Sequence, residues 1–266
     1  MSPHQLRRYG KQPLCIDGII IEPLKLVKVL GVYLDEHLSM SDQVSSVVKS
    51  CSHHLRNIDK TRKYITTDAC RAAVQGLVFS RMDYCCSLLS GLPHNQVRRL
   101  QLVQNNAARI ITRTSYSDHI SPVLATLHLI PCDLRIKFCI MTYVYKCLHQ
   151  LSPVYLQELL HIYEPRRSLR SSSDTSTLST RPSIKRVGER AFCRAASSLW
   201  NELPAEIRNL TSLITFKSRL KTFYFKQVFC LSSCFPFVKR IELLDFALYK
   251  YRCNNNNNRC RVRSMS

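Results

Sequence analysis

The sequence lacks the motifs and spacings on which most catalytic sites are built. It has six glycines and no Gly-x-x-x-x-Gly-Lys loop, so little of its backbone can cradle a phosphate. His-Glu-x-x-His, Gly-x-Ser-x-Gly and Asp-Asp are all absent, and a polymerase needs paired carboxylates to hold two metal ions. The only two adjacent acids, Asp35 and Glu36, stand at a predicted strand-to-helix corner, which favours capping or solvation. We therefore predict no active site and no resident cofactor in this chain.

Long apolar runs are also missing. No run approaches the roughly 20 residues that a helix needs to cross a bilayer, and the basic start, residues 1–11, is not followed by the apolar core of a signal peptide. We therefore expect no membrane span and no secretion, and an intracellular protein of the nucleus or cytoplasm. With 266 residues, 45% of them hydrophobic, the chain can bury the core of one or two domains.

Thirteen cysteines occur without a single Cys-x-x-Cys pair. The closest approaches are Cys85–Cys86, Cys230–Cys234 and Cys253–Cys260, and no histidine follows at the spacing of a zinc finger or knuckle. An odd number of cysteines without a signal peptide favours reduced thiols. Four fall within apolar helical patterns, where a free cysteine behaves as a small hydrophobe: Cys51, Cys70, Cys139 and Cys147. We expect these thiols to pack in the core, and we expect no bound zinc.

Acidic residues are scarce, because 18 Asp and Glu stand against 39 Lys and Arg, for a formal net charge of +21. The excess occurs in every part of the chain. Residues 166–190 hold seven basic and two acidic side chains, residues 191–229 hold six and two, and residues 230–266 hold seven and two. Clustered Lys and Arg gain affinity by displacing the counterions of phosphates, so the distribution favours nucleic acid as partner over a merely solvated basic surface.

The first 40 residues are predicted to form β structure. Two short apolar runs flank Asp17-Gly18, a strong hairpin signal because both turn positions need a positive φ. A third apolar run, residues 27–34, is interrupted by Gly31. Three short strands cannot form an independent domain, and their unpaired edges need covering. We interpret this segment as a piece of a larger sheet.

From Ser41 the apolar period changes from two to 3.6. Val44, Cys51 and Ile58 define the apolar face of a first helix, with Ser39 and Asp42 as a capping pair ahead of it. Basic side chains lie elsewhere on this helix: Lys49, His53 and Arg56. Later helices are predicted from about Thr67, over 94–113, from Pro131 and over 212–229, with a short apolar stripe ending at Trp200. Ser121-Pro122 and Ser152-Pro153 each supply a predicted N-cap serine followed by a first-turn proline.

The overall prediction is a mainly α fold, a helical bundle with a small N-terminal β-hairpin segment. Its predicted parts are the β segment 1–40, the helical region 41–165, an exposed and mobile linker 166–190 rich in Ser and Arg, the helical segment 191–229 and a poorly ordered tail 230–266. Candidate phosphate-binding side chains on the 94–113 helix and in the linker are Arg98, Arg99, Arg109, Arg113, Arg166, Arg167 and Arg170.

Several strings resemble one protein family in their order and spacing. The matching stretches are Leu30–Asp35, Leu38–Met40, Ser80–Cys85, Leu88–Pro93, Leu100–Arg109, His119–Pro122, Leu127–Pro131, Arg135–Lys137, Pro153–Leu156, Leu169–Ser171, Gly188–Phe192, Leu199–Pro204 and Phe216–Thr222. Together they resemble the C-terminal part of the reverse transcriptase of non-LTR, LINE-type retrotransposons, in the jockey-like branch. The resemblance covers about residues 3–229.

The resemblance implies a truncated RNA-directed DNA polymerase. The family's metal-binding motif, aromatic-x-Asp-Asp, would lie upstream of this chain, so the Mg²⁺ of the parent polymerase has no ligands here. Leu30-Gly31-Val32 would occupy the last hairpin of the palm, and the helices from 41 to 113 would form the thumb. The implied partners are RNA or an RNA–DNA duplex and the missing palm. Three hypotheses stay open: a nucleic-acid-binding fragment, a split subunit of an active polymerase, and a translated relic.

Each motif also has a simpler structural interpretation. Trp200 shares an apolar stripe with its neighbours, which favours a core anchor over a platform for base stacking. Asp83 and Tyr84 are expected to be a packing and hydrogen-bonding pair. Any single arginine of the 94–113 helix is most often a solvated surface group, and only the set predicts phosphate contact.

Overall fold

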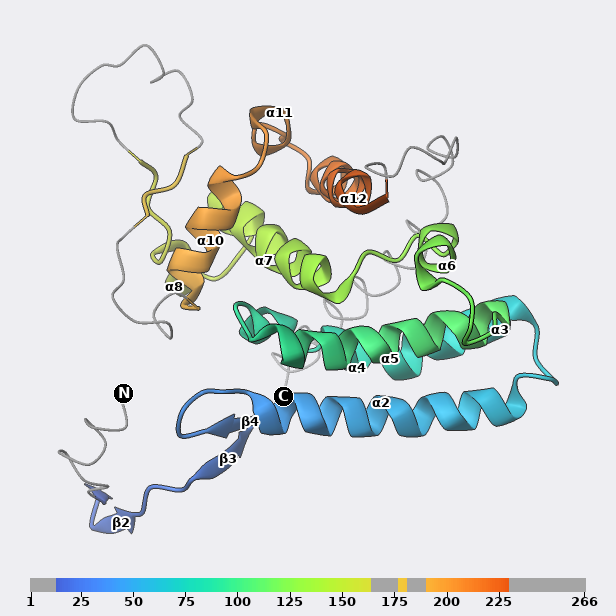
Figure 1. The fold of residues 1–266 in the computed structure, drawn as a ribbon. Helices are drawn as coiled ribbons and strands as arrows, with labels where there is room; N and C mark the ends of the chain where they lie inside the picture. Colours follow the sequence, from blue (N-terminus) through green and yellow to red (C-terminus); the bar gives the residue numbers. More distant parts are fainter. Residues whose placement is uncertain (1–12, 164–176, 181–189, 230–266) are drawn as a thin grey trace, which may run out of the picture.

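The computed structural model describes residues 13–163, 177–180 and 190–229, and in these ranges the chain is mainly helical with a small N-terminal β region (Figure 1). The strands are β1 (Leu14–Ile16), β2 (Ile19–Ile21), β3 (Leu26–Val29) and β4 (Val32–Asp35). The helices are α2 (Ser41–Thr61), α3 (Thr67–Val74), the π-helix η1 (Gln75–Phe79), α4 (Ser80–Asp83), the 3₁₀ helix η2 (Cys86–Leu89), α5 (His94–Thr112), α6 (Ile120–Thr126), α7 (Cys132–Leu148), α8 (Val154–Gln157), α10 (Phe192–Asn201), α11 (Ala205–Arg208) and α12 (Leu213–Phe229). The predicted fold class is confirmed.

The β region consists of two separate antiparallel hairpins. β1 pairs with β2 across the predicted turn, in which Asp17 and Gly18 both have positive φ, 51° and 80°. β3 pairs with β4 across Leu30 and Gly31, whose φ values are 48° and 84°. The single third strand predicted over 27–34 is therefore wrong, because Gly31 lets the chain reverse and fold the run into a hairpin.

The helices stack in layers that start from α2 at one edge of the molecule (Figure 1). α2 packs along α5 and also contacts α3, η1 and α4. α5 in turn contacts α6 and α7, and α7 contacts α10 and α12. The C-terminal ends of α2 and α5 lie at the same end of the bundle (Figure 1). α2 consequently has one face on the bundle and one face outside it.

The main core extends from α2 to α12, and aromatic rings from α7, α10 and α12 pack together in it. The ring of Phe216 stacks on Tyr145 at a centroid distance of 4.4 Å and lies 5.8 Å from the Trp200 ring. Only 1% of Trp200 is exposed, which confirms the prediction of a core anchor. Three of the four cysteines predicted in the core are buried, and Cys139 is half-buried against it.

Proline, not serine, stands at the N-cap position of several helices. At α8 the N-cap is Pro153, whose carbonyl accepts the backbone N–H of Leu156 at 3.0 Å, so the predicted cap by Ser152 is wrong. At α6 the N-cap is His119 and Ser121 lies inside the helix. Proline suits the N-cap because its fixed φ is compatible with an extended residue and the position needs no backbone donor. The other helices that begin this way have Pro93, Pro131 and Pro204 at this position.

The predicted linker contains a residue of the core. Leu178 is buried and forms a β-bridge with Ile162. The Asn201 side chain accepts the backbone N–H of Leu178 at 2.9 Å and donates to its carbonyl at 2.8 Å. The prediction of an exposed, mobile segment is therefore wrong at Leu178. Most of 166–190, and the whole tail 230–266, lie outside the described residues.

Candidate nucleic-acid interface

α2 carries a line of exposed side chains that can bear positive charge. They are Lys49, His53, Arg56 and Lys60, and we call them the α2 stripe. Their spacings of four, three and four residues keep them in one narrow sector of a helix with 3.6 residues per turn. At 1.5 Å per residue the stripe is about 17 Å long.

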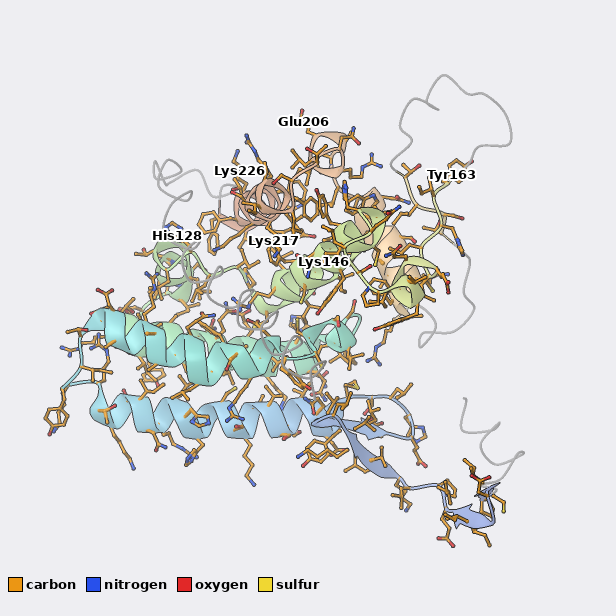
Figure 2. All side chains as sticks on the ribbon, turned by 180° about the vertical axis from the view of Figure 1, so that it is seen from behind. His128, Lys146, Tyr163, Glu206, Lys217 and Lys226 are labelled. Carbon is orange, nitrogen blue, oxygen red and sulfur yellow. The ribbon has the colours of Figure 1, made fainter. Side chains whose placement is uncertain are left out.

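The α2 stripe lies opposite the face that α2 buries. The buried apolar side chains of α2 are Val44, Cys51, Leu55 and Ile58. On a helical wheel their mean direction is about 160° away from that of the α2 stripe. α2 runs along the edge of the molecule, and side chains project outward from its free side (Figure 2). The stripe is therefore accessible along its whole length in the described structure.

Few acidic groups accompany the α2 stripe. Asp42 lies at the start of α2, and Asp59 lies on the flank of the stripe. Within the described parts of the chain, Lys49, Arg56 and Lys60 take part in no ion pair. Three cations without a protein counter-ion leave a local excess of positive charge, which attracts phosphate groups.

The predicted arginines at the start of α5 differ in exposure. Arg98 is exposed and points into solvent. Arg99 is half-buried, and its guanidinium donates hydrogen bonds to Gln96 Oε1 at 3.1 Å and to Ser45 Oγ at 3.0 Å. Arg99 thus links α5 to α2, and only Arg98 is fully available for a phosphate.

Arg109 holds the loop that follows α5. Its guanidinium donates to the carbonyl of Ser115 and, at 2.9 Å, to the carbonyl of Asp118. The guanidinium carbon also lies 5.5 Å from the ring centre of Tyr116, a cation–π distance. Because two of its donors bind the loop backbone, this side chain has a structural role.

A residue that the sequence interpretation missed, Arg62, closes the C-terminal end of α5. Arg62 is buried, and its guanidinium donates to the carbonyls of Ile110 at 2.8 Å and Ile111 at 2.9 Å. It also donates to the Ile65 carbonyl at 3.0 Å and to Thr67 Oγ1 at 3.2 Å. The last carbonyls of a helix lack partners within the helix and carry its negative dipole end, so a cation there is stabilised without a carboxylate.

Arg113 adds a hydrogen bond in the opposite direction, from the end of α5 to the end of α2. It is the C-cap residue of α5, in the left-handed region at φ 57°, and its Nη2 donates to the Arg62 carbonyl at 3.0 Å. Each arginine therefore caps the C-terminal end of the other's helix. We call the two residues the arginine clasp.

The four predicted phosphate-binding arginines that the structure describes do not form one surface. Arg99, Arg109 and Arg113 bind other parts of the chain, and Arg98 alone is free in solvent. The linker positions lie outside the described residues: Arg166, Arg167 and Arg170. The α2 stripe could have been found from its four-three-four spacing of basic residues, which was visible in the sequence.

Asp35 shapes the corner between β4 and α2. Its carboxylate accepts the backbone N–H of Ser39 and that of Met40, each at 3.0 Å. Burial raises the pKa of Asp35, but these hydrogen bonds outweigh burial and bring the pKa below its ordinary value. The predicted capping role is confirmed for Asp35, and the predicted Ser39–Asp42 capping pair is wrong, since no side chain caps α2 at its N-cap, Met40.

The remaining titratable groups form no centre for catalysis within the described residues. No three His, Cys, Asp or Glu side chains there are grouped as a metal site would require. Asp83 is paired with Arg135, and the Tyr84 hydroxyl donates to the Leu30 carbonyl at 2.7 Å. Asp83 and Tyr84 are thus the packing and hydrogen-bonding pair that was predicted.

Comparison of the chain with protein-family models, curated proteins and solved structures finds no match. Among the described residues, no helix combines the length and the apolar character of a membrane span. The family resemblance therefore stays a prediction made from sequence motifs.

Proposed function

We propose that this chain is a non-catalytic fragment of a LINE-type reverse transcriptase that binds template–primer nucleic acid through phosphate contacts. The α2 stripe is the observation that carries the proposal, together with the sequence resemblance. A charged helix face that contacts phosphates fixes the position of a duplex without reading its bases. We therefore expect RNA or an RNA–DNA duplex to bind with weak sequence preference.

The rigidity of α2 supports this proposal. The helix is 21 residues long and its inner face is anchored in the core, so its cations keep their spacing before a ligand arrives. Side chains on such a helix lose less conformational freedom on binding than those on a loop. At about 17 Å, the α2 stripe is long enough to lie against several phosphate groups of a duplex.

The test compares two triple variants of equal composition in a salt titration of a labelled RNA–DNA duplex. The first changes Lys49, Arg56 and Lys60 of the α2 stripe to Gln. The control changes Lys25, Arg219 and Lys226, which are exposed elsewhere, to Gln. Three lost phosphate contacts flatten the log–log salt dependence by roughly 2–3, whereas the control keeps the slope of the unmodified protein.

Helix content measured by circular dichroism should be the same in both variants, because Gln is a good helix former. An unchanged slope for the stripe variant contradicts the α2 interface. If Arg98→Gln then flattens the slope by itself, the interface lies on α5 as the sequence first predicted.

The proposal also predicts no polymerisation by this chain alone, because the sequence contains no Asp-Asp pair. Primer extension on an RNA template, with Mg²⁺ or Mn²⁺, should give no product. Nucleotide incorporation by the purified protein that follows the protein peak through two chromatographic steps would contradict the fragment hypothesis.

The exposed strands favour the second candidate, a split subunit of an active polymerase. The apolar side chains of β2 are all exposed, with 69% of Ile20 accessible, and such surface often marks a protein interface. A separately expressed LINE-type palm should then co-purify with this chain and restore primer extension. Co-purification that is insensitive to Ile20→Lys would argue against a contact through these strands.

A further inference from the structure

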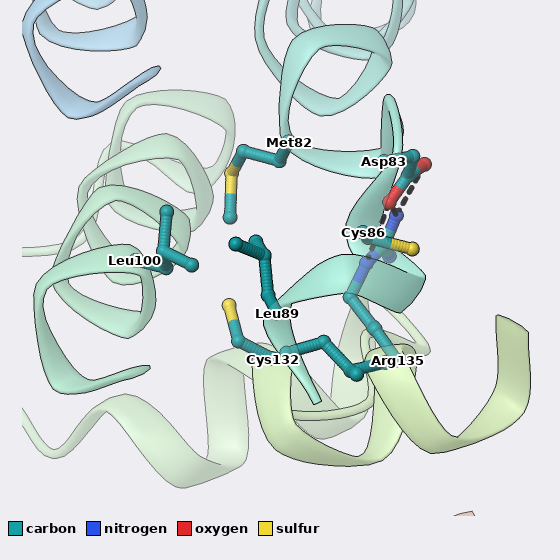
Figure 3. A pocket seen from close by; sticks show the side chains of 8 residues that line it. Met82, Asp83, Cys86, Leu89, Leu100, Cys132 and Arg135 are labelled. Atoms are coloured by element: carbon teal, nitrogen blue, oxygen red, sulfur yellow. Dashed lines mark hydrogen bonds and ion pairs between the residues drawn. The ribbon is translucent and has the colours of Figure 1, made fainter. Parts of the chain in front are cut away.

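The ion pair in the interior leaves no room for a ligand beside it. Arg135 Nη2 lies 2.7 Å from one carboxylate oxygen of Asp83 and 2.8 Å from the other. The cavity next to the pair measures about 10 Å³, which is enough for about one water molecule (Figure 3). The two charges are therefore satisfied within the fold, in contrast to the cations and aromatic rings that the protein exposes.

Two loops meet at the end of the bundle where α2 and α5 finish. Residues 62–66 join α2 to α3, and residues 113–119 join α5 to α6. Arg113 Nη2 donates to the Arg62 carbonyl at 3.0 Å, and Arg62 donates to two carbonyls in the last turn of α5 at 2.8 and 2.9 Å. The arginine clasp therefore holds these two loops together. We call them the clasp loops.

Each clasp loop exposes one tyrosine beside a cation. Tyr64 is 78% exposed and Tyr116 is 75% exposed. Lys63 Nζ lies 4.8 Å from the centre of the Tyr64 ring, and the guanidinium carbon of Arg109 lies 5.5 Å from the centre of the Tyr116 ring. Because about three-quarters of each tyrosine is still accessible, the cation leaves most of the ring open to solvent.

The clasp loops continue the α2 stripe. Lys60 is the last member of the α2 stripe and stands two residues before the first clasp loop. Within four residues of the clasp loops, five basic side chains stand against three acidic ones: Lys60, Arg62, Lys63, Arg109 and Arg113 against Asp59, Asp68 and Asp118. The excess of positive charge attracts phosphate groups. A nucleic-acid strand that runs along the α2 stripe toward Lys60 therefore reaches the clasp loops next.

We propose that Tyr64 and Tyr116 bind unpaired nucleotides, by stacking with their bases, where a strand leaves the duplex at the Lys60 end of the α2 stripe. The inference rests on the proposed function and adds single-stranded nucleic acid to its ligands. Every base has a flat π-face, so stacking on an aromatic ring tolerates any sequence, and the cations beside the rings contact the phosphates of the same strand. The clasp loops thus take the unpaired strand, and the α2 stripe takes the duplex.

The first test uses the unmodified protein and isolates the bases from the phosphates. Its ligands share one RNA–DNA duplex, which carries either an overhang of about eight unpaired nucleotides or an abasic overhang of equal length. The abasic overhang keeps the phosphates and lacks the bases. We expect the overhang with bases to bind roughly fivefold or more tightly than the abasic one, on the 3′ or the 5′ side, tested separately. Equal affinities on both sides would overturn the inference.

Variants then assign the preference for bases to the two rings. Tyr64→Leu combined with Tyr116→Leu should abolish it, because leucine is apolar but has no π-face, and phenylalanine at both positions should restore it. The control changes Tyr155 and Tyr163 to Leu, which are 66% and 51% exposed. Tyr163 lies on the opposite side of the molecule from the ends of α2 and α5 (Figures 1 and 2), and the control should keep the preference. A preference that survives in the Tyr64–Tyr116 leucine variant would overturn the assignment.

The salt dependence of binding to the duplex without an overhang distinguishes this inference from the proposed function. Leucine at Tyr64 and Tyr116 removes no phosphate contact of the α2 stripe, so the salt slope should stay that of the unmodified protein, whereas the stripe variant flattens it. If the stripe variant keeps its slope and the tyrosines still confer the preference for bases, the α2 interface is wrong and the tyrosine site stands. If the stripe variant flattens the slope and bases confer no preference, this inference alone fails.

Discussion

Strands β2 and β3 expose their apolar side chains, whereas most of the helices from α2 to α12 bury an apolar face, chiefly in one large core. The exposed fraction is 67% for Ile19 in β2 and 45% for Val29 in β3, against 1% for Trp200 in α10. Hydrophobic stabilisation is proportional to the apolar area removed from water, so these strands contribute little of it. The hairpins are held by their backbone ladders, and a two-stranded hairpin alone is marginally stable in water. The helical body therefore carries most of the hydrophobic stabilisation, and the hairpins carry little.

The boundary between the two regions lies at β4. Val32 is buried in the core, and the backbone N–H of Tyr33 donates to Gln43 Oε1 of α2 at 3.0 Å. Farther along, Arg190 donates to the Leu38 carbonyl at 2.7 Å and so holds the turn before α2 from a distance of 152 residues in the sequence. The helical body therefore positions β4, and β3 is held through its pairing with β4.

The largest expected effect on stability comes from a substitution that disrupts the core and leaves the strands intact. Trp200→Ala removes a fully buried aromatic side chain, and we expect it to lower the free energy of unfolding by about 3–5 kcal/mol. Ile20→Ala, in an exposed strand, should change it by less than about 0.5 kcal/mol. Urea unfolding followed by circular dichroism measures both. Similar losses in the two variants would show that the strands are covered in solution and that the contrast between the regions is wrong.

We expect a smaller effect on stability at the arginine clasp, which joins α2 and α5 through polar contacts and not apolar ones. Arg62→Met leaves the carbonyls of Ile110 and Ile111 without partners in a buried place, and we expect a loss of about 2–3 kcal/mol in the free energy of unfolding. Arg56→Met is the matched control on the exposed face of the same helix, with an expected change within about 0.5 kcal/mol. Thermal unfolding in parallel distinguishes them. Equal thermal unfolding midpoints for the two variants would mean that water replaces the Arg62 guanidinium with no loss of stability.

Local patterns in the sequence predicted local structure well. The period of 3.6 predicted α2 and its buried face, and Asp17-Gly18 predicted the first hairpin, because these features depend on neighbours within a few residues. The arginines were harder, since Arg62 and Arg113 are separated by about 50 residues and meet only because α2 and α5 end side by side. An arginine that caps a helix and an arginine that is free for phosphate look identical in a sequence. The α2 stripe, by contrast, was present in the spacing and was passed over for the denser cluster on α5.

The smallest expected effect lies at the corner that joins the two regions. The carboxylate of Asp35 accepts two backbone N–H groups, and its pKa is lower in the folded protein than the roughly 3.9 of an unfolded chain. The charged form therefore stabilises the fold above the unfolded pKa, and this contribution is lost as pH falls through the folded pKa.

Asp35→Asn removes the charge and one of the two acceptor oxygens, so we expect a loss of about 1 kcal/mol in the free energy of unfolding at pH 7, because the site is partly exposed and screened. The difference from the unmodified protein should shrink as the pH is lowered from 5 toward about 2, since protonation removes the same charge from Asp35. Urea unfolding at several pH values measures this.

Asp17→Asn makes the same chemical change in the exposed turn of the β1–β2 hairpin, where asparagine also tolerates a positive φ, and it should leave stability unchanged at every pH. A constant difference between Asp35→Asn and the unmodified protein across this range would show that the corner is held by geometry alone, and that the carboxylate charge contributes nothing to joining the strands to α2.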